Sequence, residues 1–314
     1  MERWLIDTDP GVDDALAIMM AHRLPGISVC ALTLAAGNVG IDHTTANALK
    51  LLDILNVDTP VHVGAPVPLV RSANDAAFVH GLDGFGDIGY TPSKRFAEAE
   101  HAVQAMIRLA RLHAGELNMI MLGPLTNLAL ALCLEPALPN LVKRLVIMGG
   151  AVTGHGNTER LPAEFNTGFD VEAAHIVFSR WPRFDLVDWE ATLAHGVPIA
   201  ELDGWLSADT DEARFYRAIS RKTRTWMSRE RNPTHWVAAD ALAMAAALRP
   251  ESARDWQERA LRVELDGALT RGATVVDWSG RMGWPVNARI LMRYDQAGFG
   301  DTIRTALGAN TTPG

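Results

Sequence analysis

Four aspartates crowd eight consecutive positions near the start of the chain, in the segment LIDTDPGVDDALAIMMA: Asp7, Asp9, Asp13 and Asp14. Carboxylates held this close repel one another, which raises their pKa values and destabilises a fold unless a cation lies among them. A helix cap explains one such aspartate, worth about 1 kcal/mol, but not several that converge. Oxygen ligands without clustered Cys or His favour Ca²⁺ or Mg²⁺ over zinc, and the shortage of phosphate-loop glycines favours Ca²⁺. We therefore predict a calcium site here.

The elements around these aspartates place them at one edge of a sheet. RWLID predicts a strand that ends at residue 7, Pro10 and Gly11 predict a turn, and a helix is expected over 13–23. In open α/β sheets, ligands bind beyond the carboxyl ends of the strands. The aspartates thus lie where a ligand is expected.

Apolar, strand-like runs alternate with helical patterns along most of the chain. The predicted strands are RWLID, ISVCALTLAA, VHV, LNMIML, KRLVIM and FDLVDW, and the predicted helices span 13–23, 41–55, 96–114, 125–134 and 170–179, with a mostly helical region up to 248. Long loops are expected over 64–94 and 149–168. This alternation predicts an α/β fold with a mainly parallel central sheet flanked by helices.

The pattern changes after Pro250. The runs ALRVEL, ATVVDW and NARILMRY predict a few extra strands near the C-terminus, followed by a last helix over 296–307. No linker, low-complexity segment or internal repeat interrupts the chain, so we predict a single domain over 1–314.

Composition limits the partners of the protein. The formal charge of -8 is spread along the chain without a Lys/Arg-rich run, which argues against a nucleic-acid partner. The longest apolar region, 119–134, is interrupted by polar residues, and the N-terminus shows no signal-peptide pattern, so we expect no membrane span and a cytoplasmic enzyme. Cys30 and Cys133 lie in apolar patterns and are expected to be buried and inert, without a disulfide framework or a zinc-thiolate site.

An Asp-x-Asp pair after a strand also occurs in haloacid-dehalogenase-type phosphatases, where the first Asp attacks phosphorus and the pair holds Mg²⁺. Here the pair is followed by Pro-Gly-Val-Asp-Asp rather than by a short Gly-Thr turn, and no convincing acidic pair follows downstream. We therefore disfavour a phosphatase.

The motifs together resemble the inosine-uridine preferring nucleoside hydrolase family, whose opening signature is Asp-x-Asp-Pro-Gly-x-Asp-Asp. The resemblance continues in the same order through most of the chain, over AAGN, HGLDGFG, GPLTNLA, VIMGG, AEFNTGFDVEAAHIVF and the Asp240 region. It implies a Rossmann-like nucleoside hydrolase fold and hydrolysis of the N-glycosidic bond of a ribonucleoside to ribose and free base, through a ribosyl cation-like transition state. A homodimer or homotetramer is implied by the resemblance alone.

The resemblance also implies a role for each site residue near the metal. The implied Ca²⁺ ligands are Asp9, Asp14, the main-chain carbonyl of Thr126, and Asp240, which is assigned to the substrate as well. The ion would bind the ribose diol and the attacking water, whose proton Asp9 would accept and which Asn38 would orient. Asp13, rotated by about 100° from Asp14 if both are helical, would point elsewhere and bind the ribose 2′-hydroxyl.

Further ligands of the nucleoside follow from the same resemblance. Glu164 would bind the ribose 5′-hydroxyl, Asn166 would lie nearer the diol, and Asn157 would be a second 5′-hydroxyl ligand, although its spacing to Glu164 is one residue longer than the family pattern. His80 lies in the HGLDGFG loop and would contact the nucleobase. Taken alone, AEFN is typical of a solvated loop, and a lone His is more often solvated or structural.

The chain departs from the family immediately before Asp240. Many purine-active members have a His there that can donate a proton to the leaving base, whereas this chain has Ala239. Activation of the base would then come from another residue, from solvent, or from stacking on Trp226 or Trp236, for which core packing is an equally good interpretation. The preferred base stays open, and a nucleoside- or ribose-binding protein with little turnover is the alternative function.

Overall fold

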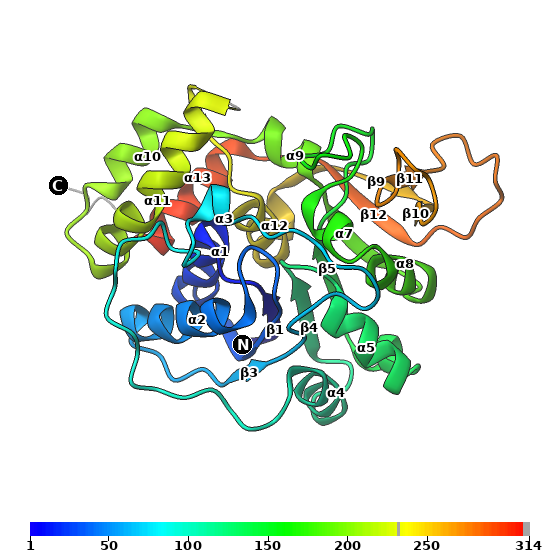
Figure 1. Cartoon of the computed structure of the whole chain (residues 1–314), viewed down its shortest axis with the longest axis horizontal. Coiled ribbons are helices and arrows are strands. Elements are labelled where there is room, and N and C mark those ends of the chain that lie inside the picture. The colour runs from blue at the N-terminus through cyan, green and yellow to red at the C-terminus, as the bar shows by residue number, and fades with distance from the viewer. Residues whose placement is uncertain (231–232, 310–314) are drawn as a thin grey trace.

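The computed structural model describes residues 1–230 and 233–309, and it confirms the α/β architecture with a mainly parallel sheet (Figure 1). Within these residues, eight strands form one sheet in the order β3-β2-β1-β4-β5-β6-β12-β9. Their bounds are β1 Glu2–Thr8, β2 Ile27–Leu34, β3 Val61–Val63, β4 Leu117–Met121, β5 Arg144–Met148, β6 Phe184–Val187, β9 Ala253–Arg259 and β12 Ala288–Tyr294. All neighbouring pairs are parallel except β12 with β9.

Helices cover both faces of this sheet. One face packs against α1 Val12–Arg23, α2 Ile41–Leu55, α11 Asp211–Glu230, α12 Ala239–Leu248 and α13 Gln296–Ala306, and the other against α4 Ala102–Leu112, α5 Thr126–Leu134, α6 Leu138–Leu141 and α8 Val171–Arg180. Successive strand residues serve opposite faces: Ile6 of β1 packs with the first group and Leu5 with the second. Both faces are buried, which explains why the strands are apolar runs rather than alternating patterns.

Shorter elements complete the fold. They are α3 Ala77–His80, α7 Phe165–Phe169, α9 Trp189–Ala194, α10 Ile199–Leu206, a 3-10 turn Pro250–Ser252, and two antiparallel pairs formed by β7 Val197–Pro198 with β8 His235–Trp236 and by β10 Leu261–Val263 with β11 Thr274–Val276. The extra C-terminal strands were predicted, and β10 and β11 lie at one end of the molecule (Figure 1).

The strand order creates a crevice beside β1. The chain runs from β1 outward through β2 to β3, and it then returns to the other side of β1 to form β4. Connections that leave neighbouring strands in opposite directions open a crevice at the carboxyl ends of those strands, which is where ligands bind in such sheets. The segments after β1, β2, β4, β5 and β6 all reach this edge.

Two helices point their N-termini at the same edge. α1 follows β1 directly, and α12 packs beside it. α12 has the sequence ADALAMAAAL, and its alanines are buried, so its backbone can approach α1 closely. The first turns of both helices carry aspartates, Asp13 and Asp14 in α1 and Asp240 in α12. Small side chains along the helices thus bring acidic side chains together at their ends.

Some predicted boundaries were wrong for identifiable reasons. The helix expected over 96–114 begins at Ala102, because Nδ1 of His101 accepts a hydrogen bond from Val103 N and because Glu98 N instead donates to Val61 O beside the sheet. β9 was missed because this edge strand is rich in charged residues, which is common at sheet edges. The region expected to be helical up to 248 also contains β7 and β8.

The cysteines were also misjudged. Cys133 is exposed and Cys30 is half-buried, and both are free thiols. Each sits in an apolar pattern, but at a position where its element meets the surface. The single domain over 1–314 stays a prediction, because 231–232 and 310–314 lie outside the described residues. No helix in the described ranges combines the length and apolar character needed to cross a membrane.

Candidate active site

An acidic cluster, which we define as Asp9, Asp13, Asp14 and Asp240, lies at the crevice beside β1. Carboxylate oxygens of Asp13, Asp14 and Asp240 lie within 4.8 Å of one another, a spacing that suits a shared metal ion. The sequence predicted that Asp13 points away from Asp14. The structure instead groups the two, because both occupy the first turn of α1 and the N-terminus of α12 lies against that turn.

Burial and mutual repulsion dominate the electrostatics of the acidic cluster. Burial, and then the charges of the neighbouring aspartates, raise the pKa values of Asp9 and Asp240 well above their ordinary range. Burial also raises the pKa values of Asp13 and Asp14. Within the described chain, no lysine or arginine is among the main influences on these four groups. A cation bound among them would relieve this repulsion.

Asp9 is enclosed by backbone. Its Oδ2 accepts a hydrogen bond of 2.7 Å from Asn38 N, at the end of β2. A Cβ added at Gly37 would lie 2.1 Å from Asp9 Oδ2, and one added at Gly123 would lie 2.4 Å from Asp9 Oδ1. Only glycine therefore fits at the ends of β2 and β4, where the chain passes the carboxylate of Asp9.

Asn38 and the turn before α1 hold Asp14. Its Oδ2 accepts hydrogen bonds from Gly11 N at 2.9 Å and from Asn38 Nδ2 at 2.9 Å, and its Oδ1 accepts one from the hydroxyl of Thr8. Asn38 Nδ2 also lies 3.2 Å from the carbonyl oxygen of Asp9. Its amide nitrogen is thus committed to the aspartates, which leaves its Oδ1 as an acceptor.

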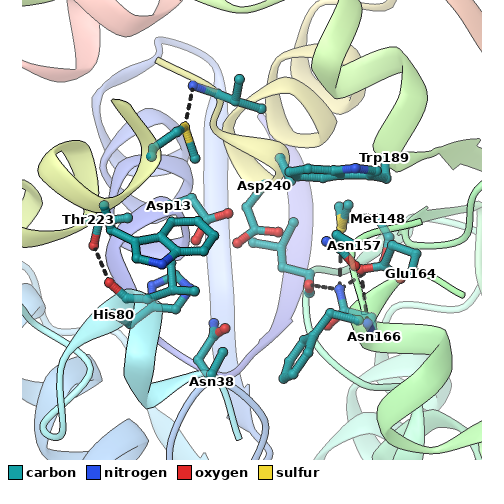
Figure 2. Close-up of a pocket in the computed structure, with 18 of the residues that line it drawn as sticks. Asp13, Asn38, His80, Met148, Asn157, Glu164, Asn166, Trp189, Thr223 and Asp240 are labelled. Atoms are coloured by element: carbon teal, nitrogen blue, oxygen red, sulfur yellow. Dashed lines mark hydrogen bonds between the residues drawn. The ribbon is translucent and has the colours of Figure 1, made fainter. Parts of the chain in front are cut away.

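A cavity opens above the acidic cluster, and Figure 2 shows Asp13, Asp240 and Asn38 between its two sides. The described lining residues are Asp13, Asn38, Ala76, Phe78, Val79, His80, Leu122, Met148, Asn157, Glu164, Phe165, Asn166, Trp189, Thr223, Trp226, Met227, Trp236, Val237, Ala239 and Asp240. None of them is lysine or arginine. The cavity combines carboxylates and amides with aromatic surface, which suits an uncharged ligand that has a hydroxylated part and a flat part.

The polar wall of this cavity, which we define as Asn157, Glu164 and Asn166, lies on the loop and short helix after β5 (Figure 2). Glu164 caps α7: its carboxylate accepts backbone N–H bonds from Gly150 at 3.0 Å, Asn166 at 2.9 Å and Thr167 at 3.1 Å. Burial nevertheless raises the pKa of Glu164 to about 7. The sequence did not reveal this capping role.

Asn166 is fixed by the strand ends beneath it. Its Nδ2 donates to the carbonyl oxygen of Leu122 at 2.7 Å, and it lies 3.3 Å from the carbonyl oxygen of Met148. Its Oδ1 is left as an acceptor on the cavity side. Asn157 N donates to Ala163 O at 3.2 Å, and the residue lines the cavity despite its unusual spacing to Glu164.

The aromatic wall, which we define as Phe78, His80, Trp226 and Trp236, comes from α3, α11 and β8. His80 Nδ1 accepts a 3.1 Å hydrogen bond from Val12 N, so the ring proton resides on Nε2. Burial lowers the pKa of His80 to about 4, against the opposing charge of Asp14. His80 is therefore a neutral donor near pH 7. Phe78 and Trp226 meet edge to face at 5.7 Å.

Thr126 and two histidines of neighbouring segments are not among the described residues that line the cavity. Thr126 begins α5, and its hydroxyl donates to Asp170 Oδ2 at 2.7 Å rather than toward the cavity. The predicted metal-binding role of its carbonyl oxygen stays a prediction. His175 does not line the cavity, and His235 lines a separate groove with Trp205 and Arg304. Strand alternation explains the last case, because His235 and Trp236 are neighbours in β8 and face opposite sides.

Sequence reasoning missed Trp189, Phe78 and Thr223 as lining residues. Trp189 directly follows the end of β6, so the rule that ligands bind at the carboxyl ends of strands could have indicated it. Phe78 and Thr223 carry no such signal, since they belong to α3 and α11. The glycines in the loop over 81–86 have positive φ and serve tight turns: Gly86 N donates to His80 O at 2.7 Å, and Phe85 is buried.

The chain resembles known proteins along nearly its whole length. A sequence profile described as inosine-uridine preferring nucleoside hydrolase matches residues 4–301. A non-specific ribonucleoside hydrolase from Klebsiella pneumoniae subsp. pneumoniae is 38% identical over 296 residues, which are 94% of this chain and 94% of that protein. A protein of the same name from Salmonella newport is 36% identical over 94% of each chain.

Solved structures agree with this likeness. An inosine-guanosine nucleoside hydrolase matches with a TM-score of 0.90 and 32% identity over 98% of each chain. A purine-preferring ribonucleoside hydrolase from Gardnerella vaginalis matches with a TM-score of 0.91 and 27% identity, again over 98% of each chain.

Proposed function

The chain belongs to the inosine-uridine preferring nucleoside hydrolase family and hydrolyses the N-glycosidic bond of ribonucleosides, and from this premise we propose how its site performs the reaction with Ca²⁺. One observation carries the proposal: Asp13 and Asp240 of the acidic cluster line the same cavity as the polar wall, and none of the described lining residues is lysine or arginine. Ribose hydroxyls match such a lining, because carboxylates and amide oxygens accept their protons.

The donor set fits a hard cation. The acidic cluster offers only carboxylate oxygens, which repel one another and which are buried except at the half-buried Asp13, and Ca²⁺ prefers carboxylate ligands. Asp14 and Asp240 would hold it, with Asp13 beside them by geometry, and with Asp9 and the carbonyl oxygen of Thr126 as the resemblance implies. When bound, Ca²⁺ supplies positive charge that offsets the repulsion among the aspartates and makes a nearby water more acidic.

Asp9 is the general base of the proposal. The oxygen of a water attacks C1′ of the ribose while the C1′–N bond breaks, and the electron pair of that bond leaves with the nucleobase. Asp9, whose carboxylate is held beside Asn38, accepts a proton from the water. Asn38 lies beside Asp9 and retains Oδ1 as an acceptor, so it orients the water.

The polar wall binds the ribose, together with Asp13. Glu164 and Asn157 bind the 5′-hydroxyl, Asn166 accepts from a hydroxyl nearer the diol, and Asp13 binds the 2′-hydroxyl. Because Glu164 and Asn166 are held by backbone groups, they present fixed acceptors to the ribose. Acceptors that are already fixed lose little side-chain entropy when the ribose binds.

The aromatic wall receives the base. Its rings offer stacking surface, and His80 donates its Nε2 proton toward an acceptor on the base. Ala239 lines the cavity without a titratable group and His80 is neutral, so the leaving nucleobase takes its proton from solvent while His80 donates only a hydrogen bond. This arrangement selects the sugar more strictly than the base.

A panel assay tests the function against the alternative of a binding protein with little turnover. Purine and pyrimidine ribonucleosides are incubated with the protein, with Ca²⁺ or with a chelator, and free ribose is measured by its reducing end. We expect Ca²⁺-dependent release from at least one nucleoside. Binding without release from every nucleoside would instead identify a receptor.

The proposal extends to the setting of the enzyme. We infer a cytoplasmic homodimer or homotetramer that acts on free ribonucleosides, supported by the family resemblance. Light scattering of the purified protein would show the mass of a dimer or a tetramer, and a monomer mass would contradict this part of the proposal.

A further inference from the structure

Three consecutive residues after β6 bind the loop that follows β5. Asp188 caps α9 by accepting a 2.8 Å hydrogen bond from Ala191 N, and its other oxygen accepts one of 2.9 Å from Val152 N. Trp189 N donates to Gly150 O at 3.0 Å, and its indole lines the cavity (Figure 2). The ends of two neighbouring strands are thereby joined beside the polar wall.

Glu190 makes the largest share of these contacts. Its Oε2 accepts a 2.7 Å hydrogen bond from Thr153 N, while its Oε1 accepts one of 2.7 Å from the Thr153 hydroxyl and one of 2.9 Å from His155 N. Its side chain is only 17% exposed, yet it does not line the cavity. Glu190 therefore acts on the loop and not on a ligand.

The bound stretch of loop leads directly to Asn157. Only Gly156 lies between His155 and Asn157, and both of these next residues are fixed from the other side: Gly156 N donates to Leu161 O at 2.7 Å, and Asn157 N to Ala163 O at 3.2 Å. A Cβ at Gly156 would lie 2.1 Å from Ala163 O, so the two sides of the loop lie in close contact here. Asn157 is held between these two anchors.

We propose that Glu190 is a positioning residue for the 5′-hydroxyl subsite, because it fixes the loop that carries Asn157. The inference rests on the proposed function, since it takes Asn157 as a ligand of the ribose 5′-hydroxyl. Without Glu190, the amides of Thr153 and His155 turn to water; the start of the loop stays bound at Gly150 and Val152, but the stretch next to Asn157 keeps only its contacts with Leu161 and Ala163. Asn157 then loses its fixed place beside Glu164, and recognition of the 5′ end weakens.

The test compares a ribonucleoside with its 5′-deoxy analogue. In Glu190→Ala, we expect kcat/KM for the ribonucleoside to fall by about tenfold, mainly through KM, and that for the 5′-deoxynucleoside by less than about twofold. A purely structural role would lower both values by the same factor. Equal losses for the two substrates would overturn the proposal.

A double-mutant cycle shows whether Glu190 acts through Asn157. We define the 5′-discrimination ratio as kcat/KM for the ribonucleoside divided by kcat/KM for its 5′-deoxy analogue. In an Asn157→Ala background, Glu190→Ala should change this ratio by less than about twofold, because the same contact cannot be lost twice. Glu190→Gln keeps one acceptor oxygen, so its 5′-discrimination ratio should lie between those of Glu190→Ala and the wild type. An Asn157→Ala protein that discriminates as well as the wild type would contradict the proposal.

Asp277→Ala provides the matched control. Asp277 also accepts two backbone N–H bonds, from Arg281 at 3.0 Å and Met282 at 2.7 Å, but in a loop that does not line the cavity. The Asp277→Ala variant should leave the 5′-discrimination ratio unchanged. If wild type releases no base from any nucleoside, the proposed function fails. If the wild type does release base, a Glu190→Ala variant with the same Tm and the same 5′-discrimination ratio as the wild type would contradict the positioning role alone.

Discussion

The two walls of the cavity are built in different ways. The polar wall belongs to the segment after β5, and its side chains are bound to backbone groups: Glu164 accepts three amides and Asn166 donates to strand-end carbonyls. The aromatic wall belongs to α3, α11 and β8. Phe78 and Trp226 pack edge to face, and a bond of 3.0 Å from the Thr223 hydroxyl to Val79 O joins α11 to α3.

This difference separates strict from permissive recognition. Fixed acceptors reject a ligand that lacks the matching hydroxyl, because buried polar groups are then left unpaired. Aromatic rings offer surface to any flat base, with weak directional preference. We therefore expect one sugar to be required and several bases to be accepted. The acidic cluster lies beneath both walls and serves every substrate alike.

The largest effects should come from the acidic cluster. Asp9→Ala and Asp14→Ala should each abolish Ca²⁺ binding and lower kcat by about 10³-fold or more, because each removes a proposed charged ligand and Asp9 is also the proposed general base. Calorimetric titration and initial rates with inosine and uridine measure this. Asp42, in the first turn of α2 and exposed, is the matched control. Unchanged Ca²⁺ affinity in both variants would remove the proposed site.

The next effect concerns the proton for the leaving base. Without an acid at Ala239, a riboside with a good leaving group such as p-nitrophenolate should be cleaved much faster than inosine, and Ala239→His should narrow the gap by about 10²-fold. Rates with both substrates provide the ratio. A wild type that cleaves both equally well, together with selective loss of inosine cleavage in His80→Ala, would assign the acid to His80.

A smaller effect should distinguish the walls directly. Trp226→Ala should change the ratio of purine to pyrimidine cleavage by roughly tenfold, because one base loses more stacking surface than the other. Asn166→Ala should lower cleavage of all ribonucleosides by a common factor. The measurement is kcat/KM for the nucleoside panel. If Asn166→Ala changed the base ratio and Trp226→Ala did not, the division of labour between the walls would be reversed.

The smallest effect concerns pH. Burial raises the pKa of Glu164 to about 7, so the folded protein retains a proton that the unfolded chain has lost, and stability falls as pH rises toward and through that value. Relative to Glu164→Gln, the wild type should lose about 1 kcal/mol of unfolding free energy between about pH 6 and about pH 8. Urea unfolding of the metal-free proteins at both values tests this. Parallel curves would mean that Glu164 is ionised throughout.

The sequence predicted one side of the site better than the other. Asp9 and Asn38 closely follow the ends of β1 and β2, so strand order alone gathers them at one edge, whereas the AEFN motif marked Glu164 and Asn166 on the long loop after β5. The aromatic wall depends on how α11 lies across α3, a packing of distant segments that no local pattern encodes. Asp13 shows the intermediate case: its place in α1 was predicted, but its approach to Asp240 depends on how closely α12 packs.

The glycines beside Asp9 bear on how the motif aspartates are interpreted in related sequences. A methyl group at Gly37 or Gly123 would occupy the space of the Asp9 carboxylate while every carboxylate and amide of the site stayed in the sequence. Because Asp9 is both a proposed Ca²⁺ ligand and the proposed general base, we expect Gly123→Ala to impair Ca²⁺ binding and hydrolysis much as Asp9→Ala does. A relative that keeps all the motif aspartates, but has alanine at either position, should therefore be tested for turnover before it is assigned to catabolism.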